Sequence, residues 1–297
     1  MTRKGLIVTR KNQVSEERLR DRFEKDWGSG VMPSMHWFAS ADKWRHLSFS
    51  YNNPYNIVSV HSEMFLLAAH ERELRKMLKG RALVFLGLGV GDTEMLVVEY
   101  ILEPGEALNL VAVDVNREFI DDFEASLRNK ILEKDDYEVH LHRLWQVFED
   151  LDHGQLRLGN DGKRAVVCFG NSIGNYPDSV DFVEILRRTC SCGDLVLLGY
   201  QLDTFAKELF DKYKQNVIFS NFVLDYTRKG AKQCKLRWVF DPAKSAVMAY
   251  CGSVLVFYSR KFRFGVVRDL LKAAGFRVVL HEHDQARNSA ILLAECA

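Results

Sequence analysis

The stretch "ALVFLGLGVGDTEMLVVEYIL", residues Ala82–Leu102, changes its pattern halfway along. Its first half is a run of apolar, strand-favouring residues that ends in glycines, which is typical of a buried strand followed by a tight turn. Its second half places apolar residues at helical spacing. A strand, a glycine turn and a helix in this order predict the first unit of a β-α-β fold.

The same alternation continues toward the C-terminus. Strands joined by helices predict an α/β fold with a doubly wound, Rossmann-like parallel sheet, whose ligand binds at the carboxyl ends of the strands. A helix that ends at Gly275 and a final strand pair return to this pattern near the end of the chain. The expected segments are "LNLVAVDV", "NREFIDDFEASLRNKIL", "YEVHLHRL", "RAVVCFGN", "SVDFVEILRRTC", "DLVLLGYQL", "FGVVRDLLKAAGF", "RVVLHEH" and "SAILLAEC".

Two regions interrupt the alternation. Residues 1–80 are irregular and aromatic-rich before a helix, and residues 205–260 combine a long helical pattern, a basic loop and a strand pair, "KLRWVFD" with "SVLVFYSRKF". We expect both regions to form an accessory layer over the ligand edge. The core is then expected to comprise residues 81–204 and, after the insertion that follows the fifth strand, residues 261–297.

The composition is that of a globular protein of balanced charge. Of 297 residues, 47% are apolar and 27% charged, and the net charge of +1 favours neither nucleic acid nor an anionic membrane as a partner. The apolar runs are strand-sized and the first residues lack a signal-peptide core, so we expect no membrane span and a cytoplasmic location. The six cysteines form no C-x-x-C pair, which predicts reduced thiols and no bound metal.

Gly87, Gly89 and Gly91 stand where the first core strand meets its helix. Glycines there let the backbone approach a ligand closely, and the helix N-terminus offers free N–H donors. Asp114 ends the next strand, where a carboxylate can accept hydrogen bonds from both hydroxyls of a ribose. Together they predict an adenosine-containing ligand, either NAD or S-adenosylmethionine (SAM). The alternatives are a plain tight turn and a helix-capping role for Asp114, although Asn116 could serve as the cap equally well.

The fourth core strand ends in "AVVCFGNSIGNYPD", residues 165–178, with more glycine, asparagine and serine than a turn requires. In methyl transfer the acceptor must approach the methyl group in line, so acceptor-binding groups belong at this strand end. Gly170 permits close approach, Ser172 supplies a hydroxyl, and the Asn175 amide can both donate and accept hydrogen bonds. No Tyr-x-x-x-Lys motif of a hydride-transfer site follows the strand, and the loop therefore favours SAM over NAD.

Three segments resemble the SAM-dependent histidine Nα-methyltransferases of ergothioneine biosynthesis. "FGNSIGNY" resembles that family's "LGSTIGN" loop, and "FLGLGVGD…VAVDVNREFI" is similar to its "ELGSG…VDVS" cofactor segment. "FYSRKFRFGVVRDLLKAAGF" resembles its "EISAKF…AGL" segment. The shared order of these segments, over roughly residues 80–297, makes the resemblance specific.

The resemblance implies a SAM methyltransferase sheet with an accessory substrate-binding layer, and SAM as the cofactor. Asn175 would hold the acceptor's amino and carboxylate groups and Tyr213 would contact the substrate, so these two are the expected catalytic residues. The cofactor-binding candidates are Gly87, Gly89, Gly91, Asp114, Gly170 and Asn171. The other substrate-binding candidates are Ser172, Trp238, Phe257, Ser259, Tyr51 and Tyr55, although tyrosines around Pro54 can equally be turn residues.

Three positions depart from the family pattern. Phe257 replaces a glutamate that recognises imidazole, and Trp238 replaces a methionine in the preceding strand. Both changes make the acceptor pocket more apolar and aromatic, which argues against histidine and favours a less polar amine, with a cation–π contact from Trp238. Phe85 replaces the acidic residue that opens the cofactor motif, while Asp114 and the glycine turn remain.

The sequence therefore predicts a divergent member of this family, a SAM-dependent N-methyltransferase that acts on a small amino acid or amine. An RNA or protein methyltransferase is an alternative because of the basic run "YTRKGAKQCKLRW", residues 226–238, although the balanced net charge counts against it. "YNNPYN", residues 51–56, resembles a motif of adenine amino-methyltransferases but precedes the glycine turn. A catalytically silent SAM-binding protein is consistent with Phe85 and the altered pocket.

Overall fold

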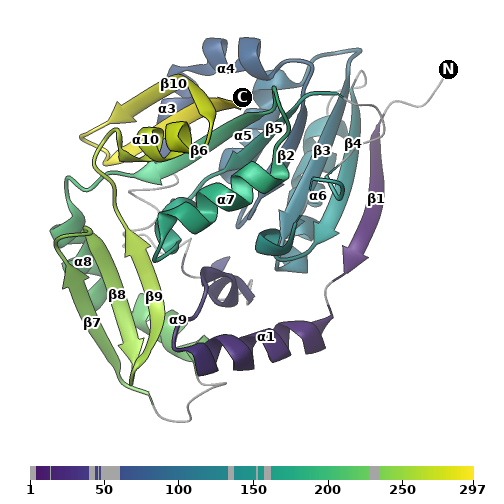
Figure 1. The fold of residues 1–297 in the computed structure, drawn as a ribbon. Helices are drawn as coiled ribbons and strands as arrows, with labels where there is room; N and C mark the ends of the chain where they lie inside the picture. Colours follow the sequence, from purple (N-terminus) through teal and green to yellow (C-terminus); the bar gives the residue numbers. More distant parts are fainter. Residues whose placement is uncertain are drawn as a thin grey trace.

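The chain is built on an eight-stranded sheet in the order β1-β4-β3-β2-β5-β6-β11-β10 (Figure 1). The structure, a computed structural model, describes residues 5–13, 15–39, 44–45, 47, 61–132, 137–151, 153–156, 162–227 and 234–297. The strands of this sheet are β1 (Leu6–Gln13), β2 (Ala82–Leu86), β3 (Ala107–Asp114), β4 (Glu138–Trp145), β5 (Arg164–Cys168), β6 (Leu195–Gln201), β10 (Phe276–Asp284) and β11 (Ser289–Cys296).

The sheet is mostly parallel and doubly wound. The strands from β1 to β6 pair in parallel, whereas β11 pairs antiparallel with both β6 and β10. Helices cover both faces and form two separate apolar clusters with the sheet. One face carries α3 (His61–Ala69), α4 (Glu71–Leu78), α5 (Asp92–Ile101) and α6 (Arg117–Leu132); the other carries α7 (Ser179–Thr189) and α10 (Val266–Ala273). The predicted α/β, Rossmann-like fold is confirmed.

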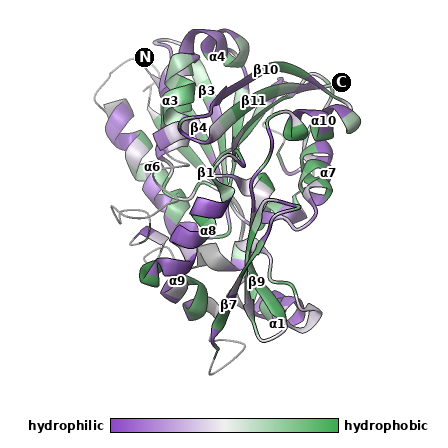
Figure 2. Cartoon of the chain, turned by 90° about the vertical axis from the view of Figure 1, so that its left-hand side faces the viewer, coloured by the Kyte–Doolittle hydropathy of each residue, from purple (hydrophilic) through white to green (hydrophobic). Residues whose placement is uncertain are grey.

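The central strands are apolar throughout because both of their faces are buried. In β2, Leu83 and Phe85 face the α3–α6 cluster, while Val84 and Leu86 face the α7 and α10 cluster. Figure 2 shows the contrast between the hydrophobic strands and the hydrophilic surfaces of α4 and α8. The ring of Phe85 lies 5.4 Å from that of Phe123 on α6, so this residue contributes to the core.

Two strands are not indicated by the sequence pattern. β1 pairs with β4 at the edge of the main sheet, where one side of a strand has no neighbour and polar residues are tolerated. β8 (Ala246–Cys251) lies between β7 (Leu236–Asp241) and β9 (Val254–Arg260), so the expected direct pairing of β7 with β9 is wrong. Left-handed residues at Ser245 (φ 49°) and Gly252 (φ 62°) allow the two tight turns that enclose β8.

The cysteines also differ from the expectation of six reduced thiols, which is wrong for Cys234 and Cys251. These two form a disulfide, with their Cα atoms 5.6 Å apart. The antiparallel pairing of β7 with β8 brings them together, since Cys251 lies opposite Leu236, two residues beyond Cys234. Cys168, Cys190, Cys192 and Cys296 are free thiols.

The segments outside the core lie beneath the carboxyl ends of the parallel strands (Figure 1). They comprise α1 (Glu16–Ser29), a 3-10 helix η1 (Ser34–Ala39), α8 (Ala206–Gln215), α9 (Val217–Thr227) and the β7-β8-β9 sheet. The N-terminal segment is joined to this small sheet, because the Met32 amide donates to the Leu255 carbonyl at 2.9 Å. Within the ranges given above, no helix combines the length and apolar character needed to cross a membrane.

Candidate active site

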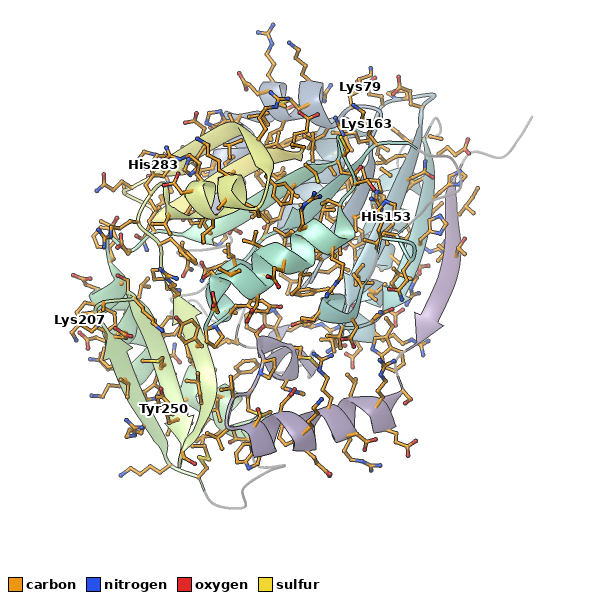
Figure 3. The ribbon with its side chains drawn as sticks, in the orientation of Figure 1. Lys79, His153, Lys163, Lys207, Tyr250 and His283 are labelled. Carbon is orange, nitrogen blue, oxygen red and sulfur yellow. A yellow bond between two sulfur atoms is a disulfide. The ribbon has the colours of Figure 1, made fainter. Side chains whose placement is uncertain are left out.

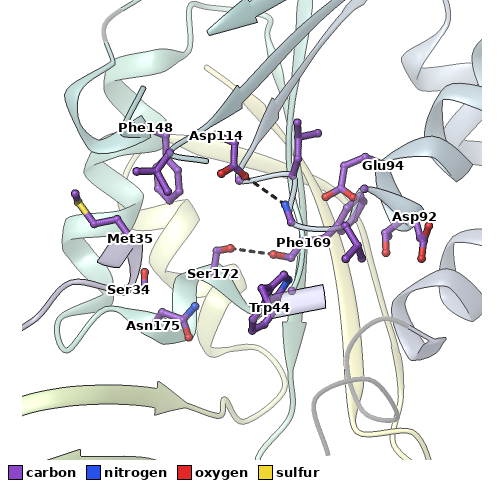
Figure 4. Close-up of a pocket in the computed structure, with 18 of the residues that line it drawn as sticks. Ser34, Met35, Trp44, Asp92, Glu94, Asp114, Phe148, Phe169, Ser172 and Asn175 are labelled. Carbon is purple, nitrogen blue, oxygen red and sulfur yellow. Dashed lines mark hydrogen bonds between the residues drawn. The ribbon is translucent and has the colours of Figure 1, made fainter. Parts of the chain in front are cut away.

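A cleft opens at the carboxyl ends of β2, β3 and β5 (Figure 4). Its empty space, with the part open to solvent included, is about 880 Å³. The cleft is lined by Ser34, Met35, Trp44, Glu63, Gly87, Leu88, Gly89, Val90, Gly91, Asp92, Thr93, Glu94, Asp114, Val115, Val147, Phe148, Glu149, Phe169, Gly170, Ser172 and Asn175.

The glycine turn forms the floor of the cleft. Gly87, Gly89 and Gly91 all have positive φ (74°, 54° and 79°), a conformation that side chains disfavour. The Gly91 amide donates to the Leu88 carbonyl at 2.9 Å, which closes the turn directly before α5. A Cβ atom at Gly91 would also lie only 3.2 Å from Phe123. The turn therefore requires glycine both for its backbone conformation and for its packing.

Asp114 is held as a buried acceptor at the end of β3. Its Oδ1 accepts from the Asn116 amide at 2.7 Å and its Oδ2 accepts from the Gly89 amide at 3.3 Å (Figure 4). Burial raises the pKa of Asp114 to about 7, and the backbone hydrogen bonds oppose that rise. Asn116 accepts from the Glu118 amide at 2.9 Å and so caps α6, which leaves the Asp114 carboxylate facing the cleft.

Glu63 is a second buried acid of the cleft, and the sequence pattern did not indicate it. Its carboxylate accepts from the Gly170 amide at 3.0 Å, and burial raises its pKa to about 8. A Cβ atom at Gly199 on β6 would lie 2.3 Å from Glu63 Oε1, so the absence of a side chain there makes room for the carboxylate. Glu63 lies on α3, well before the glycine turn, and only the fold brings it to Gly170.

The cleft is acidic overall. Glu94 on α5 is buried, and its pKa is raised well above the ordinary value, first by burial and then by the neighbouring Glu63, Asp92 and Asp114. A cationic ligand would relieve this repulsion and favour the ionised carboxylates. The Asp114 carboxylate can accept hydrogen bonds from the two hydroxyls of a ribose, and the other acids can neutralise a positive charge. This combination fits SAM, which carries a ribose, a sulfonium group and an ammonium group.

The loop after β5 is built by its own polar side chains. Asn171, with φ of 61°, accepts from the Gln201 amide at 3.0 Å and donates to the Arg260 carbonyl at 3.1 Å. The Ser172 hydroxyl donates to the Phe169 carbonyl at 2.9 Å (Figure 4). A Cβ atom at Gly174 would lie 2.3 Å from Asn171 Nδ2. These contacts tie the loop to β6 and β9 and leave Asn175 lining the cleft.

A second, smaller pocket adjoins the cleft. Gly170, Asn175 and Trp44 line both spaces. The residues that line the second pocket are Trp44, Gly170, Asn171, Asn175, Gln201, Tyr213, Phe219, Phe222, Phe257 and Ser259. None of these described lining residues is charged. The pocket is thus a mainly aromatic chamber with amide and hydroxyl groups at its junction with the cleft.

The aromatic walls of the second pocket pack against one another. Phe219 on α9 lies 4.8 Å from Tyr213 and 5.1 Å from Phe257, measured between ring centroids. Trp238 packs on Phe257 at 5.7 Å and on Phe219 at 6.0 Å, and it is not among the lining residues. Trp238 therefore lies behind the wall and supports it.

The structure brings most of the sequence-predicted residues to these two spaces. Gly87, Gly89, Gly91, Asp114 and Ser172 line the cleft; Tyr213, Phe257 and Ser259 line the second pocket. Asn171 was expected to lie beside the cofactor; the structure places it in the lining of the second pocket. Tyr51, Tyr55 and residues 228–233 of the basic run lie outside the described residues.

Another hollow lies at the opposite, amino-terminal edge of the sheet, near Lys163 and His153 (Figure 3). Its buried cation, Arg164, is already paired with Asp194 at 2.5 Å. The His153 ring contacts the Ser191 hydroxyl. Because ligands of doubly wound sheets bind at the carboxyl edge, the cleft at Asp114 is the candidate active site.

One family model matches this chain, and several solved structures are similar to it. A family model described as "Histidine-specific methyltransferase, SAM-dependent" matches residues 58–250. The chain is similar to the solved structure of magnesium protoporphyrin IX methyltransferase from Synechocystis PCC 6803 with bound SAH, at 13% identity and a TM-score of 0.49, covering 95% of this chain and 100% of that one. It is also similar to a SAM-dependent methyltransferase from Clostridium acetobutylicum, at 10% identity and a TM-score of 0.49, covering 86% and 98%. The search of curated proteins found no match.

The family match covers more than half of the 297 residues. It includes the glycine turn, Asp114, the loop after β5 and the Tyr213 side of the second pocket. The chain therefore belongs to the family of SAM-dependent, histidine-specific methyltransferases and is an enzyme whose cofactor is SAM.

Proposed function

We propose that this enzyme methylates the amine nitrogen of a small amino acid or amine other than histidine. The observation that supports this most strongly is the junction of the two spaces, where Gly170 and Asn175 line both. SAM supplies an electrophilic methyl group when it is bound. An acceptor in the second pocket would meet the cleft at this junction, and the missing side chain of Gly170 leaves room for close approach.

The residues around the junction have complementary roles in this proposal. The Asn175 amide would hold the acceptor nitrogen through its oxygen, which accepts an N–H hydrogen bond and directs the lone pair. The aromatic side chains would exclude water from the nitrogen. Burial raises the pKa of Tyr213, so its hydroxyl stays protonated and can donate a hydrogen bond to the acceptor. A neutral amine needs no base before it attacks the methyl group.

The second pocket offers little to an imidazole ring. By the resemblance drawn from the sequence, Phe257 stands where the family would carry a glutamate that recognises imidazole; Phe219 and Trp238 pack against it. An imidazole N–H placed there would find no carboxylate among the described lining residues, only the neutral oxygens of amides and hydroxyls. An acceptor with an apolar or aromatic side chain suits these walls better.

Restoring the family's glutamate should change the acceptor preference. In Phe257→Glu we expect methylation of histidine, relative to an aromatic amine or amino acid, to rise by about tenfold or more because the imidazole gains a charged acceptor. The measurement is a competition assay with labelled SAM and equal concentrations of the two acceptors. Phe257→Leu, which adds no acceptor, is the control and should not favour histidine. A wild-type enzyme that already prefers histidine would contradict the proposal.

The acidity of the cleft predicts a pH-dependent response at Glu63. In Glu63→Gln we expect the affinity for SAM relative to S-adenosylhomocysteine, which lacks the sulfonium charge, to fall about tenfold near pH 8.5. The positive charge of SAM favours the ionised form of Glu63, whose pKa is about 8 in the free protein. Below about pH 8, SAM binding to the wild-type protein should therefore release a proton. Calorimetry in buffers of different ionisation enthalpy measures both quantities.

The same residue predicts a stability change. A carboxyl whose pKa is raised on folding stabilises the folded state at low pH, and this contribution is lost as the pH rises toward the folded-state value of about 8. Glu63→Gln should therefore flatten the fall in the free energy of unfolding of the ligand-free protein between about pH 5 and pH 8. This is the window between the ordinary pKa of a glutamate and its raised pKa in the folded protein. Glu71→Gln, which removes an exposed carboxylate of α4, is the matched control and should behave like wild type. Equal pH profiles for all three proteins would contradict the role given to Glu63.

The direct test of the proposed function is a screen of individual acceptors with methyl-labelled SAM. The panel comprises L-tryptophan, L-tyrosine, L-phenylalanine and L-histidine, each with its decarboxylated amine. We expect transfer to at least one compound other than L-histidine and histamine. Transfer to histidine alone would overturn the choice of substrate, and transfer to none of them would overturn the proposed substrate class.

A further inference from the structure

One tryptophan of the N-terminal segment borders both spaces of the site. Trp44 is 5% exposed and lines the cleft as well as the second pocket (Figure 4). The centre of its ring lies 5.6 Å from that of Phe222 on α9, and its Nε1 lies 3.5 Å from the position that a Cβ atom at Gly89 would take. Trp44 therefore connects the glycine turn with the aromatic wall of the second pocket.

The next residue, Arg45, binds α6 and lines neither space. Its Nε and Nη2 donate to Asp122 Oδ2 at 2.9 Å and 2.5 Å, and its Nη1 donates to Glu118 Oε2 at 3.1 Å. These two acids are four residues apart on α6 and so lie on one face of the helix. Trp44 and Leu47 are instead buried in the apolar cluster on that side of the sheet. The segment is thus fixed to the core by its apolar side chains and to α6 by its cation.

The ion pairs of Arg45 are too exposed to contribute much to the stability of the whole protein. The side chains of Arg45, Asp122 and Glu118 are 27%, 47% and 58% exposed, and ion pairs at such positions add little to the free energy of unfolding. Their geometry is nevertheless specific, because three donors of one planar guanidinium meet two carboxylates. Their main effect is therefore local, on the direction of the backbone that carries Trp44.

We infer that Arg45 is a positioning residue for SAM binding, which holds the indole of Trp44 against the glycine turn through its ion pairs with α6. Arg45 acts on the cofactor only through Trp44, since it lines neither space itself. The inference rests on SAM occupying the cleft at Asp114 and is independent of which acceptor is methylated.

The test is a calorimetric titration of the full-length protein with SAM, which requires no acceptor. In Trp44→Ala we expect about tenfold weaker binding, because an aromatic wall of the cleft is lost. In Arg45→Met we expect about fivefold weaker binding, at the upper end for an exposed ion pair. Arg45→Lys should recover part of this loss, because it keeps the charge but cannot donate from a planar fork.

A double-mutant cycle separates positioning from an unrelated effect of Arg45. If Arg45 acts through Trp44, the protein that carries both Trp44→Ala and Arg45→Met should bind SAM about tenfold more weakly than wild type, as Trp44→Ala does alone. Independent contributions would multiply to about fiftyfold. Asp122→Asn removes the partner charge from the other side, and combining it with Arg45→Met should add no further loss.

Two controls complete the test. Arg75→Met removes an exposed arginine that pairs with Glu71 within α4, away from both spaces, and should bind SAM like wild type. Thermal unfolding of Arg45→Met should occur close to the wild-type temperature, because its ion pairs are exposed. Wild-type affinity in Arg45→Met or in Trp44→Ala, a multiplied loss in the double variant, or a large decrease in the unfolding temperature of Arg45→Met would each overturn the inference. None of these results would bear on the acceptor screen, so the proposed function is tested separately.

Discussion

Replacing Asp114 with asparagine is expected to weaken SAM binding about 100-fold or more, the effect of losing two hydrogen bonds to a charged group. The carboxylate lies at the end of β3, faces the cleft and is held by the Gly89 and Asn116 amides. Asparagine keeps the shape of the side chain but has one acceptor atom in place of two. Calorimetric titration with SAM measures the change in the dissociation constant.

The Asp114 variant should remain folded. Burial raises the pKa of Asp114 to about 7, so ionisation of this group opposes folding of the ligand-free protein near neutral pH. Its removal relieves that effect and offsets the acceptor that either the Gly89 or the Asn116 amide loses. Asp92→Asn is the matched control, because Asp92 also lines the cleft but begins α5 rather than ending β3. It should weaken SAM binding much less. Wild-type affinity in a folded Asp114→Asn protein would show that the ribose binds elsewhere.

Asn175→Ala is expected to lower kcat/KM for the methyl acceptor about 100-fold, as when a reacting group is held out of position. Asn175 is one of the residues that line both the cleft and the second pocket, and its amide is the polar group proposed to orient the acceptor nitrogen. SAM affinity should stay close to that of wild type, since Asp114 and the glycine turn are unchanged. Steady-state kinetics with the best acceptor of the screen, together with SAM titration, separate the two effects.

Ser172→Ala provides the comparison for Asn175. The Ser172 hydroxyl already donates to the Phe169 carbonyl, so its role is largely within the loop, and we expect a decrease in kcat/KM of less than about tenfold. If Asn175→Ala and Ser172→Ala reduced turnover equally, the amide would have no special place at the reacting nitrogen. A large loss of SAM affinity in Asn175→Ala would instead assign this residue to the cofactor.

The features that the sequence predicted correctly are those that local pattern encodes. Strands such as β2 are buried on both faces, so Leu83 to Leu86 form an uninterrupted apolar run. The glycine turn needs positive φ, and three glycines mark it in the sequence. The place of Asp114 at the end of β3, lining the cleft, was predicted because it follows an apolar run; its role in binding a ribose stays a prediction.

The features that were missed depend on contacts between distant parts of the chain. β1 has only three apolar residues, followed by five polar ones, and it pairs with β4, more than a hundred residues away. Glu63 is one of several acids on α3 and α4, and nothing local distinguishes it from those that remain exposed. Arg45 lies in an irregular segment, and its pairing with Asp122, 77 residues further along the chain, cannot be read from spacing. The Cys234–Cys251 disulfide likewise depends on the pairing of β7 with β8, a strand that the sequence pattern did not indicate.

The measurement that tests the central claim most directly is methyl transfer from labelled SAM to three separate pools. The pools are free amino acids and amines, total RNA, and protein extract, and mass spectrometry identifies the labelled product. We predict label in the first pool, on the amine nitrogen of a compound other than histidine, and its loss with Asn175→Ala. Label confined to RNA or protein, or no label in any pool despite measurable SAM binding, would contradict the account.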